Sequence, residues 1–267
     1  MNSLQIYCVT DKDLSYLRNL PCKLAGVGKS SFSKKYYLAN TNYNIDYKEK
    51  YYSELTFHYW LWKNEFKNLD KKSWIGFCQK RRFWIKRNIL KKDINIDNLN
   101  KFILSEPPEE WNGFNSVVCE PIYVNGVNKV KLLKRGIRSI IRDPSIFFNE
   151  EKQTVKLHFD MHHGYGNLDK AIDLLGDEDR EEFRTYVDNN ISFNPHIMFI
   201  AKVYIAEKWF SSLFLWLFKC EKVFGLESLH GYDTQRLYAY LAERYLSFWF
   251  KKYSKYIEWP YITFSNI

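Results

Sequence analysis

Continuous apolar runs alternate with polar segments in the first part of the chain. Residues 4–9 form an apolar run with β-branched and aromatic members, which predicts a buried strand that ends at Thr10. Residues 74–78 repeat this pattern and predict a second strand. Between these runs, residues 54–66 are apolar on nearly all sides, which predicts a helix buried between layers and capped by Ser53.

The middle of the chain is more polar. Residues 86–110 are rich in Lys and Asn and predict a helical excursion that ends at the Pro107-Pro108 break. Residues 116–124 predict a third strand, interrupted by Pro121, and the basic residues 127–142 predict a short helix.

A strict alternation follows. Between residues 155 and 160, Val, Leu and Phe alternate with Lys, His and Asp, and this period of two predicts a half-exposed strand. Asn167 can cap a short helix that Gly176 ends. Residues 178–189 predict another helix, whose acidic start suits the helix dipole.

The last third is helical. Residues 196–200 predict a short strand, and residues 202–224 and 234–255 predict two long amphipathic helices separated by Gly225 and Gly231. The aromatic stripes of these helices are typical of core, although an aromatic and basic face near residues 251–255 leaves membrane contact open.

Strands that alternate with helices indicate an α/β protein. The sequence shows no linker, internal repeat or low-complexity tail, so we expect a single domain over residues 1–267. Ligands of such folds gather at the carboxyl ends of strands. Thr10, residues 79–82 and residues 160–163 would then share one edge of the sheet.

The composition narrows the environment and the partners. The formal charge is +9, which attracts phosphates, anionic lipid or nucleic acid. Five widely spaced cysteines without a CxxC pair indicate neither a disulfide framework nor a zinc site, and Cys8 and Cys78 fit buried thiols of a reducing cytosol. The sequence shows neither a signal peptide nor an apolar run long enough to span a membrane. We therefore expect a cytoplasmic protein, with peripheral contact to the inner membrane left open.

Two segments carry candidate chemistry. Gln79, Lys80, Arg81 and Arg82 end the second predicted strand, and they indicate either a solvated basic turn or a clamp for a diphosphate. Spacing alone favours the turn.

The second segment is DMHHG, at residues 160–164. Asp160 with His162 and His163 could form a general base or supply metal ligands, and the competing interpretation is a set of hydrogen-bonded surface histidines. The acidic residues 177–179 fit the first turn of a helix better than a metal motif. The GVGKS segment lacks the spacing of a phosphate-binding loop.

The block YSELTFHYWLWKN, at residues 52–64, closely resembles the signature of a bacterial family found in capsule and lipopolysaccharide loci. That family has long been catalogued as a domain of unknown function. It is regarded as glycosyltransferase-like, and some members are associated with galactofuranosyl transfer. The rest of the chain is similar to the family pattern in order, at residues 9–12, 44–45, 81–83, 163 with 168–169, 198–200, 235–236 and 242–244.

The chain departs from that pattern at several positions. Asp11 replaces the first His, Gln79 and Lys80 replace a His-Tyr pair before the arginines, and Ile197 replaces an Asn. A role that needs those imidazoles does not carry over to this chain, whereas the role of the paired arginines does.

The resemblance implies roles for specific residues. Thr10 would border the nucleotide, and Gln79 with Lys80, Arg81 and Arg82 would face the diphosphate, whose charge grows as the glycosidic bond breaks.

The same interpretation gives roles to further residues. Glu54 would position sugar hydroxyls or else serve as the negative charge of a helix N-terminus. Asp160 would be the base for the acceptor hydroxyl, with His162 and His163 nearby. Asp169 and Arg236 would bind substrate, and for Asp169 and Glu243 a structural pairing with arginines is the alternative.

The resemblance also implies an α/β fold of the GT-A-like, nucleotide-binding type, with a mixed sheet flanked by helices. The implied partners are a nucleotide-sugar donor, for example a UDP-linked one, and a growing glycan or lipid-linked acceptor, with no nucleic acid expected. A divalent Mg²⁺ or Mn²⁺ is left open, because the cations could replace a metal. The alternative functions are a nucleic-acid-binding module and a catalytically inactive capsule-assembly protein.

Overall fold

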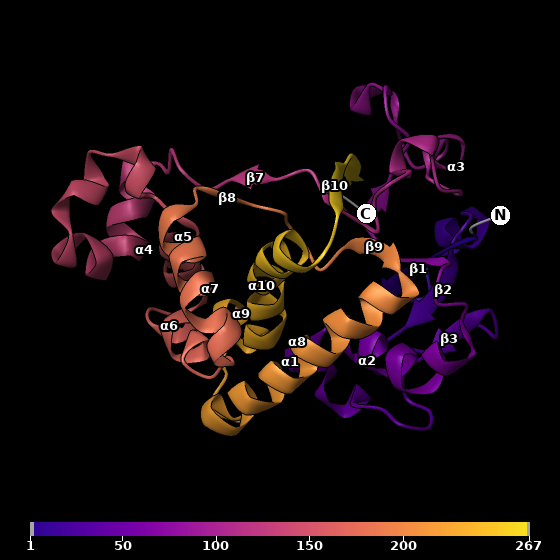
Figure 1. Cartoon of the computed structure of the whole chain (residues 1–267), viewed down its shortest axis with the longest axis horizontal. Helices are drawn as coiled ribbons and strands as arrows, with labels where there is room; N and C mark the ends of the chain where they lie inside the picture. Colours follow the sequence, from indigo (N-terminus) through magenta and orange to yellow (C-terminus); the bar gives the residue numbers. More distant parts are fainter. Residues whose placement is uncertain (1–2, 266–267) are drawn as a thin grey trace. The chain divides into compact units, whose positions relative to one another are not determined.

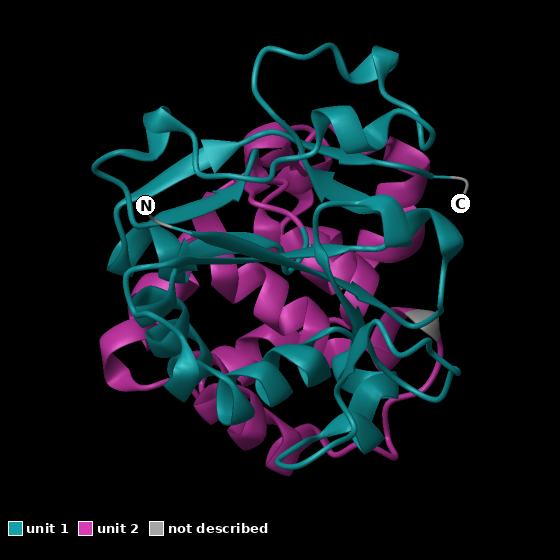
Figure 2. Cartoon of the chain, turned by 90° about the vertical axis from the view of Figure 1, so that its right-hand side faces the viewer, with its two compact units in different colours: residues 1–120, 196–212, 249–267 teal, residues 121–195, 213–248 magenta. Residues whose placement is uncertain are grey.

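The computed structural model of the protein describes residues 3–265 (Figure 1). The described chain divides into two compact units (Figure 2). Unit 1 comprises residues 1–120, 196–212 and 249–267, and unit 2 comprises residues 121–195 and 213–248. The expectation of a single domain stays a prediction.

The strands are β1 (Leu4–Thr10), β2 (Lys23–Gly26), β3 (Tyr36–Leu38), β4 (Trp74–Gln79), β5 (Arg82–Trp84), β6 (Ser116–Cys119), β7 (Ile122–Tyr123), β8 (Ser192–Phe193), β9 (Phe199–Lys202), β10 (Tyr256–Trp259) and β11 (Tyr261–Thr263). The α-helices are α1 (Glu49–Tyr52), α2 (Leu55–Asn64), α3 (Leu99–Phe102), α4 (Lys129–Arg142), α5 (Val155–His163), α6 (Asn167–Ile172), α7 (Asp177–Asn189), α8 (Val203–Phe224), α9 (Tyr232–Gln235) and α10 (Leu237–Tyr253). Short 3₁₀ turns occupy residues 15–19, 46–48, 66–68, 91–93, 109–111, 144–147 and 150–152.

Unit 1 is built on a mixed sheet in the order β10-β6-β9-β4-β1-β2-β3, and β5 pairs with both β4 and β11. Strands β3, β2, β1 and β4 run parallel, and β9 lies antiparallel to both β4 and β6. The parallel centre explains the continuous apolar runs of β1 and β4, because such strands are covered on both faces.

The two faces of this sheet have separate cores. Tyr7, Phe77 and Phe199 line one face, where Phe57 of α2 packs against Tyr7 with ring centroids 5.5 Å apart. His58 of α2 lies 4.1 Å from the Phe77 ring on the same face. The other face carries a second apolar cluster, which includes Ile6, Cys8, Trp74, Cys78, Trp84, Trp111, Val117, Ile200 and Trp259.

Unit 2 is mainly helical. Helix α5 packs against α4, α6, α7 and α9, and the short pair β7-β8 is antiparallel. Within this unit Trp216 Nε1 donates to the Ala171 carbonyl at 2.7 Å, and Tyr245 Oη donates to Asp179 Oδ2 at 2.5 Å. The aromatic side chains of α8 and α10 are largely buried, which confirms that they form core.

The structure corrects four predictions. Residues 155–160 form helix α5 and not a strand, because α5 has helices on several sides and its polar residues are only partly exposed. Residues 86–110 contain only short helical turns. Ser53 does not cap α2; it has a φ of 50°, and Glu54 occupies the cap position. Helix α6 is preceded by Gly166 in the cap position, so Asn167 is its first residue.

The remaining elements agree with the sequence patterns. Strands β1 and β4, the basic helix α4, and helices α7 and α8 lie close to their predicted positions. None of the five cysteines forms a disulfide, and Cys8 and Cys78 are buried as predicted. Within residues 3–265, no helix combines the length and apolar character needed to cross a membrane.

Candidate functional site

The carboxyl edge of the parallel strands in unit 1 contains a topological switch point. After β1 the chain builds β2 and β3 on one side of it, and then crosses to build β4 on the other side. Ligands of open α/β sheets bind outside the carboxyl ends of the strands at such a point. Here β1 ends at Thr10 and β4 ends at Gln79, so the segments that follow these residues form the candidate site.

An ion pair joins the two sides of the switch point. Lys80 Nζ, just after β4, donates to Asp11 Oδ1, just after β1. Burial by itself raises the pKa of Asp11, but the bond and charge of Lys80 outweigh this effect and hold that pKa below its ordinary value. Tyr16 Oη also donates to the Lys80 carbonyl, which fixes the backbone of the turn. The cation therefore has a defined position.

A second set of hydrogen bonds connects Glu54, through Gln79, to Arg82, the second of the paired arginines. Gln79 Nε2 donates to Glu54 Oε1, and Arg82 Nη1 donates to Gln79 Oε1. The Arg82 Nε is buried without a hydrogen-bond partner among the described residues. Arg81 is exposed at the tip of the β4–β5 turn, and its carbonyl accepts from Phe264 N at 2.9 Å. Glu54, Gln79 and Arg82 thus form one connected group.

Thr10 is buried and already bonded within its own turn. Its Oγ1 donates to the Lys12 carbonyl at 2.8 Å and accepts from Lys12 N at 3.1 Å. Its own carbonyl accepts from Val27 N at 3.0 Å. Thr10 therefore shapes the end of β1 and links it to the segment after β2.

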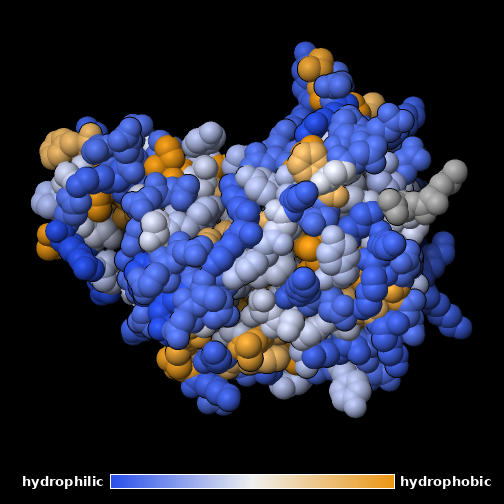
Figure 3. Space-filling view, in the orientation of Figure 1, coloured by the Kyte–Doolittle hydropathy of each residue, from blue (hydrophilic) through white to orange (hydrophobic). Residues whose placement is uncertain are grey.

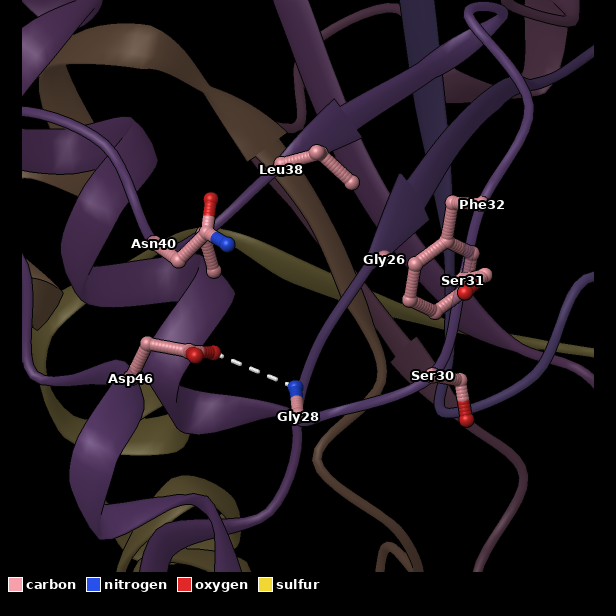
Figure 4. A pocket seen from close by; sticks show the side chains of 9 residues that line it. Gly26, Gly28, Ser30, Ser31, Phe32, Leu38, Asn40 and Asp46 are labelled. Atoms are coloured by element: carbon pink, nitrogen blue, oxygen red, sulfur yellow. Dashed lines mark hydrogen bonds between the residues drawn. The ribbon is translucent and has the colours of Figure 1, made fainter.

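A pocket of about 270 Å³ lies at the ends of β2 and β3 (Figure 4). Its walls come from two segments, at residues 26–32 and 38–46, with Phe32 and Leu38 as apolar sides. Asp46 Oδ1 accepts from Gly28 N at 3.1 Å, which ties the two segments together and holds the carboxylate at the pocket. Gly28 has a φ of 76°, a conformation that favours glycine.

The pocket and the ion pair adjoin along the sheet edge. Gly26, in the pocket wall, pairs in register with Thr10, and Val9 pairs with Gln79. Because neighbouring strands lie about 4.8 Å apart, the distance from β2 to β4 is roughly 10 Å. Among residues 3–265, no three His, Cys, Asp or Glu side chains gather in a group that could hold a metal ion.

The second group of predicted site residues lies on helix α5 in unit 2. Because this segment is a helix, the expectation that it shares a strand edge with Thr10 is wrong. Asp160 Oδ1 accepts from Gly166 N at 3.0 Å, and burial raises the pKa of Asp160 to about 6. This value suits a general base near neutral pH.

The histidines next to Asp160 are held in a network of their own. His162 Nδ1 lies 2.9 Å from the His158 carbonyl, and His163 stacks on Tyr240 with ring centroids 3.6 Å apart. Burial lowers the pKa of His163 to about 3, so its imidazole is neutral at physiological pH. Arg244, which is 1% exposed, lies with its Nη2 3.1 Å from His158 Nδ1.

The remaining predicted residues either form ion pairs or are exposed. Asp169 pairs with Lys156 at 2.7 Å and with Arg184 at 3.4 Å, which fits the alternative of a structural arginine partner. Glu243 pairs with Arg244. Arg236 is exposed at the end of α9.

Several features of the edge escaped sequence reasoning. Asp11 and Lys80 both depart from the family pattern, and the sequence alone does not indicate that they contact each other. Tyr16 and Asp46 gave no signal, because only the fold brings them beside residues distant in sequence. The glycines at 26 and 28 were the one available hint of the pocket.

Comparison with solved structures finds a similar fold. A chain described as "WbbM bifunctional glycosytransferase apo structure" superposes with a TM-score of 0.67 at 20% sequence identity. The match covers 99% of this chain and 46% of that chain, so this chain spans less than half of the length of its structural relative. This chain therefore shares the mixed α/β fold of that structure, as expected from the sequence. A search of curated proteins finds no match.

A family model also matches residues 5–255, which is most of the chain. The sequence resemblance pointed to a family of this kind, and the match extends across both units. The chain belongs to the family described as "Domain of unknown function (DUF4422)".

Proposed function

We propose that the protein is a glycosyltransferase that moves a sugar from a nucleotide-sugar donor to a glycan acceptor in capsule or lipopolysaccharide synthesis. The observation that carries this proposal is the group of cations held at the topological switch point of unit 1, beside a pocket. The family membership and the fold shared with a glycosyltransferase support it.

In this proposal the donor lies along the carboxyl edge of the sheet. The nucleoside occupies the pocket at β2 and β3, where Asp46 accepts hydrogen bonds from hydroxyl groups. The diphosphate then reaches Lys80, Arg81 and Arg82. The roughly 10 Å between β2 and β4 matches the reach of a nucleoside diphosphate, for example UDP.

The chemistry follows from the charge of the leaving group. When the glycosidic bond breaks, negative charge grows on the departing diphosphate, and fixed cations stabilise that charge more in the transition state than in the ground state. Arg82 retains donors beyond the one bonded to Gln79, and Lys80 retains two beyond the one bonded to Asp11. These donors would contact the phosphate oxygens.

The acceptor step of the reaction needs a general base. We propose Asp160 as the base that takes the proton of the acceptor hydroxyl, because its pKa of about 6 leaves it ionised at neutral pH yet basic enough to accept a proton. Glu54 would position donor hydroxyls, while its bond to Gln79 orients Arg82.

The cationic edge would act in place of Mg²⁺ or Mn²⁺. Transfer that continues in excess EDTA supports this part of the proposal. Transfer that stops in EDTA and returns when Mn²⁺ is restored contradicts it.

The test is a panel of nucleotide sugars, screened for thermal stabilisation and for turnover. Arg81→Ala and Arg82→Ala should each lower kcat/KM by roughly a hundredfold to a thousandfold with melting temperatures close to wild type. The control removes two exposed cations of unit 1 outside the edge, in Lys67→Ala/Lys92→Ala. Equal turnover in all these proteins would end the assignment.

A further inference from the structure

Helix α4 of unit 2 has an unusual composition. Its 14 residues, KVKLLKRGIRSIIR, contain six cations and no acidic residue. Asn128 caps the helix, with its side chain accepting from Val130 N at 2.9 Å. The helix is therefore defined from its first turn, and its length is about 21 Å.

Only one narrow side of α4 packs against the protein. Leu132 and Gly136 are its buried residues, and Leu132 clusters with Leu157 and Met161 of α5. A Cβ on Gly136 would lie 3.5 Å from the Met161 sulfur, so glycine keeps the two helices close. Ser139 and Ile140 are partly buried, and Ile140 packs against the same cluster, whereas the other residues of α4 are exposed.

A stripe of large apolar side chains lies on that solvent-facing surface. The exposed fractions are 59% for Val130, 46% for Leu133, 44% for Ile137 and 74% for Ile141. At 3.6 residues per turn these four positions fall within an arc of about 80°. Phe148, just beyond the helix, is 80% exposed. Apolar and hydrophilic surface lie side by side in the left-hand part of Figure 3, where Figure 1 places α4.

The cations adjoin this stripe. Lys131, Lys134, Arg135, Arg138 and Arg142 fall within an arc of about 100° next to it. Arg135 pairs with Asp233 at 3.3 Å, and the other four have no ion pair among the described residues. A helix whose outer face only contacts water would not expose four aliphatic side chains along one side, next to such a cationic surface.

We propose that α4 is a membrane-binding helix that lies in the interface of an anionic lipid bilayer. The apolar stripe would enter the boundary between headgroups and acyl chains, and the cations would contact the lipid phosphates. Nucleic acid fits the cations but offers little to the aliphatic stripe, since such interfaces are strongly polar. A second copy of α4 would bring the like charges of two helices together.

Membrane binding through α4 needs no residue of unit 1, so it does not depend on the donor site. The membrane contact would then lie on α4 and not at residues 251–255, where the sequence leaves it open.

Vesicle sedimentation tests the proposal with the full-length protein. Binding should appear with vesicles that mix phosphatidylglycerol into phosphatidylcholine, be weak with phosphatidylcholine alone, and fall with added salt. Lys134→Gln/Arg142→Gln should lower the partition coefficient about 25-fold, at roughly fivefold for each cation. Leu133→Ser/Ile137→Ser, which keeps every charge, should lower it about tenfold or more.

The matched control is Lys67→Gln/Lys92→Gln, which removes the same charge from unit 1 and should bind like wild type. All four altered side chains of α4 are exposed, so melting temperatures should match wild type in every variant. Three results would overturn the proposal. They are equal binding of wild type and both α4 variants, absence of binding to any vesicle, and self-association in sedimentation velocity that Leu133→Ser/Ile137→Ser abolishes.

Discussion

The carboxyl group of Asp160, the proposed base, makes the stability of the protein depend on pH. Burial raises its pKa from 3.8 to about 6, while its Oδ1 accepts from Gly166 N at 3.0 Å. Asp160→Asn replaces the ionisable group with an amide that keeps an oxygen for this bond. The substitution therefore removes the charge and little else.

The expected gain follows from the pKa. A shift of about 2 units corresponds to about 3 kcal/mol against the ionised form in the folded state. Below pH 3.8 both the folded and the unfolded chain hold the proton, so no penalty exists. As the pH rises to about 6 only the unfolded chain loses it, and stability falls; above pH 6 the full penalty remains. Because Asp160 is half-buried, we expect Asp160→Asn to gain about 1–3 kcal/mol at neutral pH.

Urea denaturation at pH 4 and at pH 7.5 measures this difference. The variant should be more stable than wild type at pH 7.5 and close to it at pH 4. In the same preparations kcat/KM for transfer should fall by roughly a hundredfold to ten-thousandfold, since the base is lost. In wild type, kcat/KM should rise as the pH increases through about 6.

Two outcomes would refute this reasoning. A stability difference of the same size at both pH values would show that the carboxyl group is not destabilised by ionisation. Full transfer activity in a folded Asp160→Asn protein would remove Asp160 as the base.

Three further substitutions test other parts of the structure. Burial lowers the pKa of His58 to about 3, so between pH 6.5 and pH 5 only the unfolded chain takes up this proton. Wild type should therefore lose about 2 kcal/mol of stability from this residue over that range. Urea melts at the two pH values should show that His58→Phe abolishes this loss. Gly76→Ala should destabilise by about 1–3 kcal/mol, because its Cβ would lie 2.6 Å from Ile200 Cγ1; an unchanged denaturation midpoint would show that the sheet adjusts without cost. Lys80→Met should weaken the affinity for UDP by roughly tenfold to a hundredfold in calorimetric titration. It should also raise the pKa of Asp11, because the carboxylate loses its bonded cation. Unchanged affinity would remove Lys80 from the phosphate site.

The central sheet could be predicted from local sequence because burial on both faces leaves a strong signal. Strands β1 and β4 are continuous apolar runs, and each lies between two hydrogen-bonded neighbours with apolar cover on both faces. The alternating segment 155–160 gave a wrong prediction, because its local pattern does not reflect how the segment packs. Helix α5 contacts several other helices, so its burial does not follow a clean helical period.

The candidate site was predictable only in part. Arg81 and Arg82 stood out because they interrupt an apolar run at its end. The pairing of Lys80 with Asp11 joins residues separated by 69 positions, and no local pattern can indicate it. The exposed stripe of α4 was equally hidden, because a sequence pattern shows that a helix is amphipathic but not which apolar residues the fold leaves uncovered.

The most direct test of the account is a crystal structure of the protein soaked with UDP or a UDP-sugar. We predict phosphate oxygens about 3 Å from the Lys80 and Arg82 nitrogens, with the nucleoside in the pocket beside Gly28 and Asp46. A nucleotide bound away from this edge of the sheet would contradict the account.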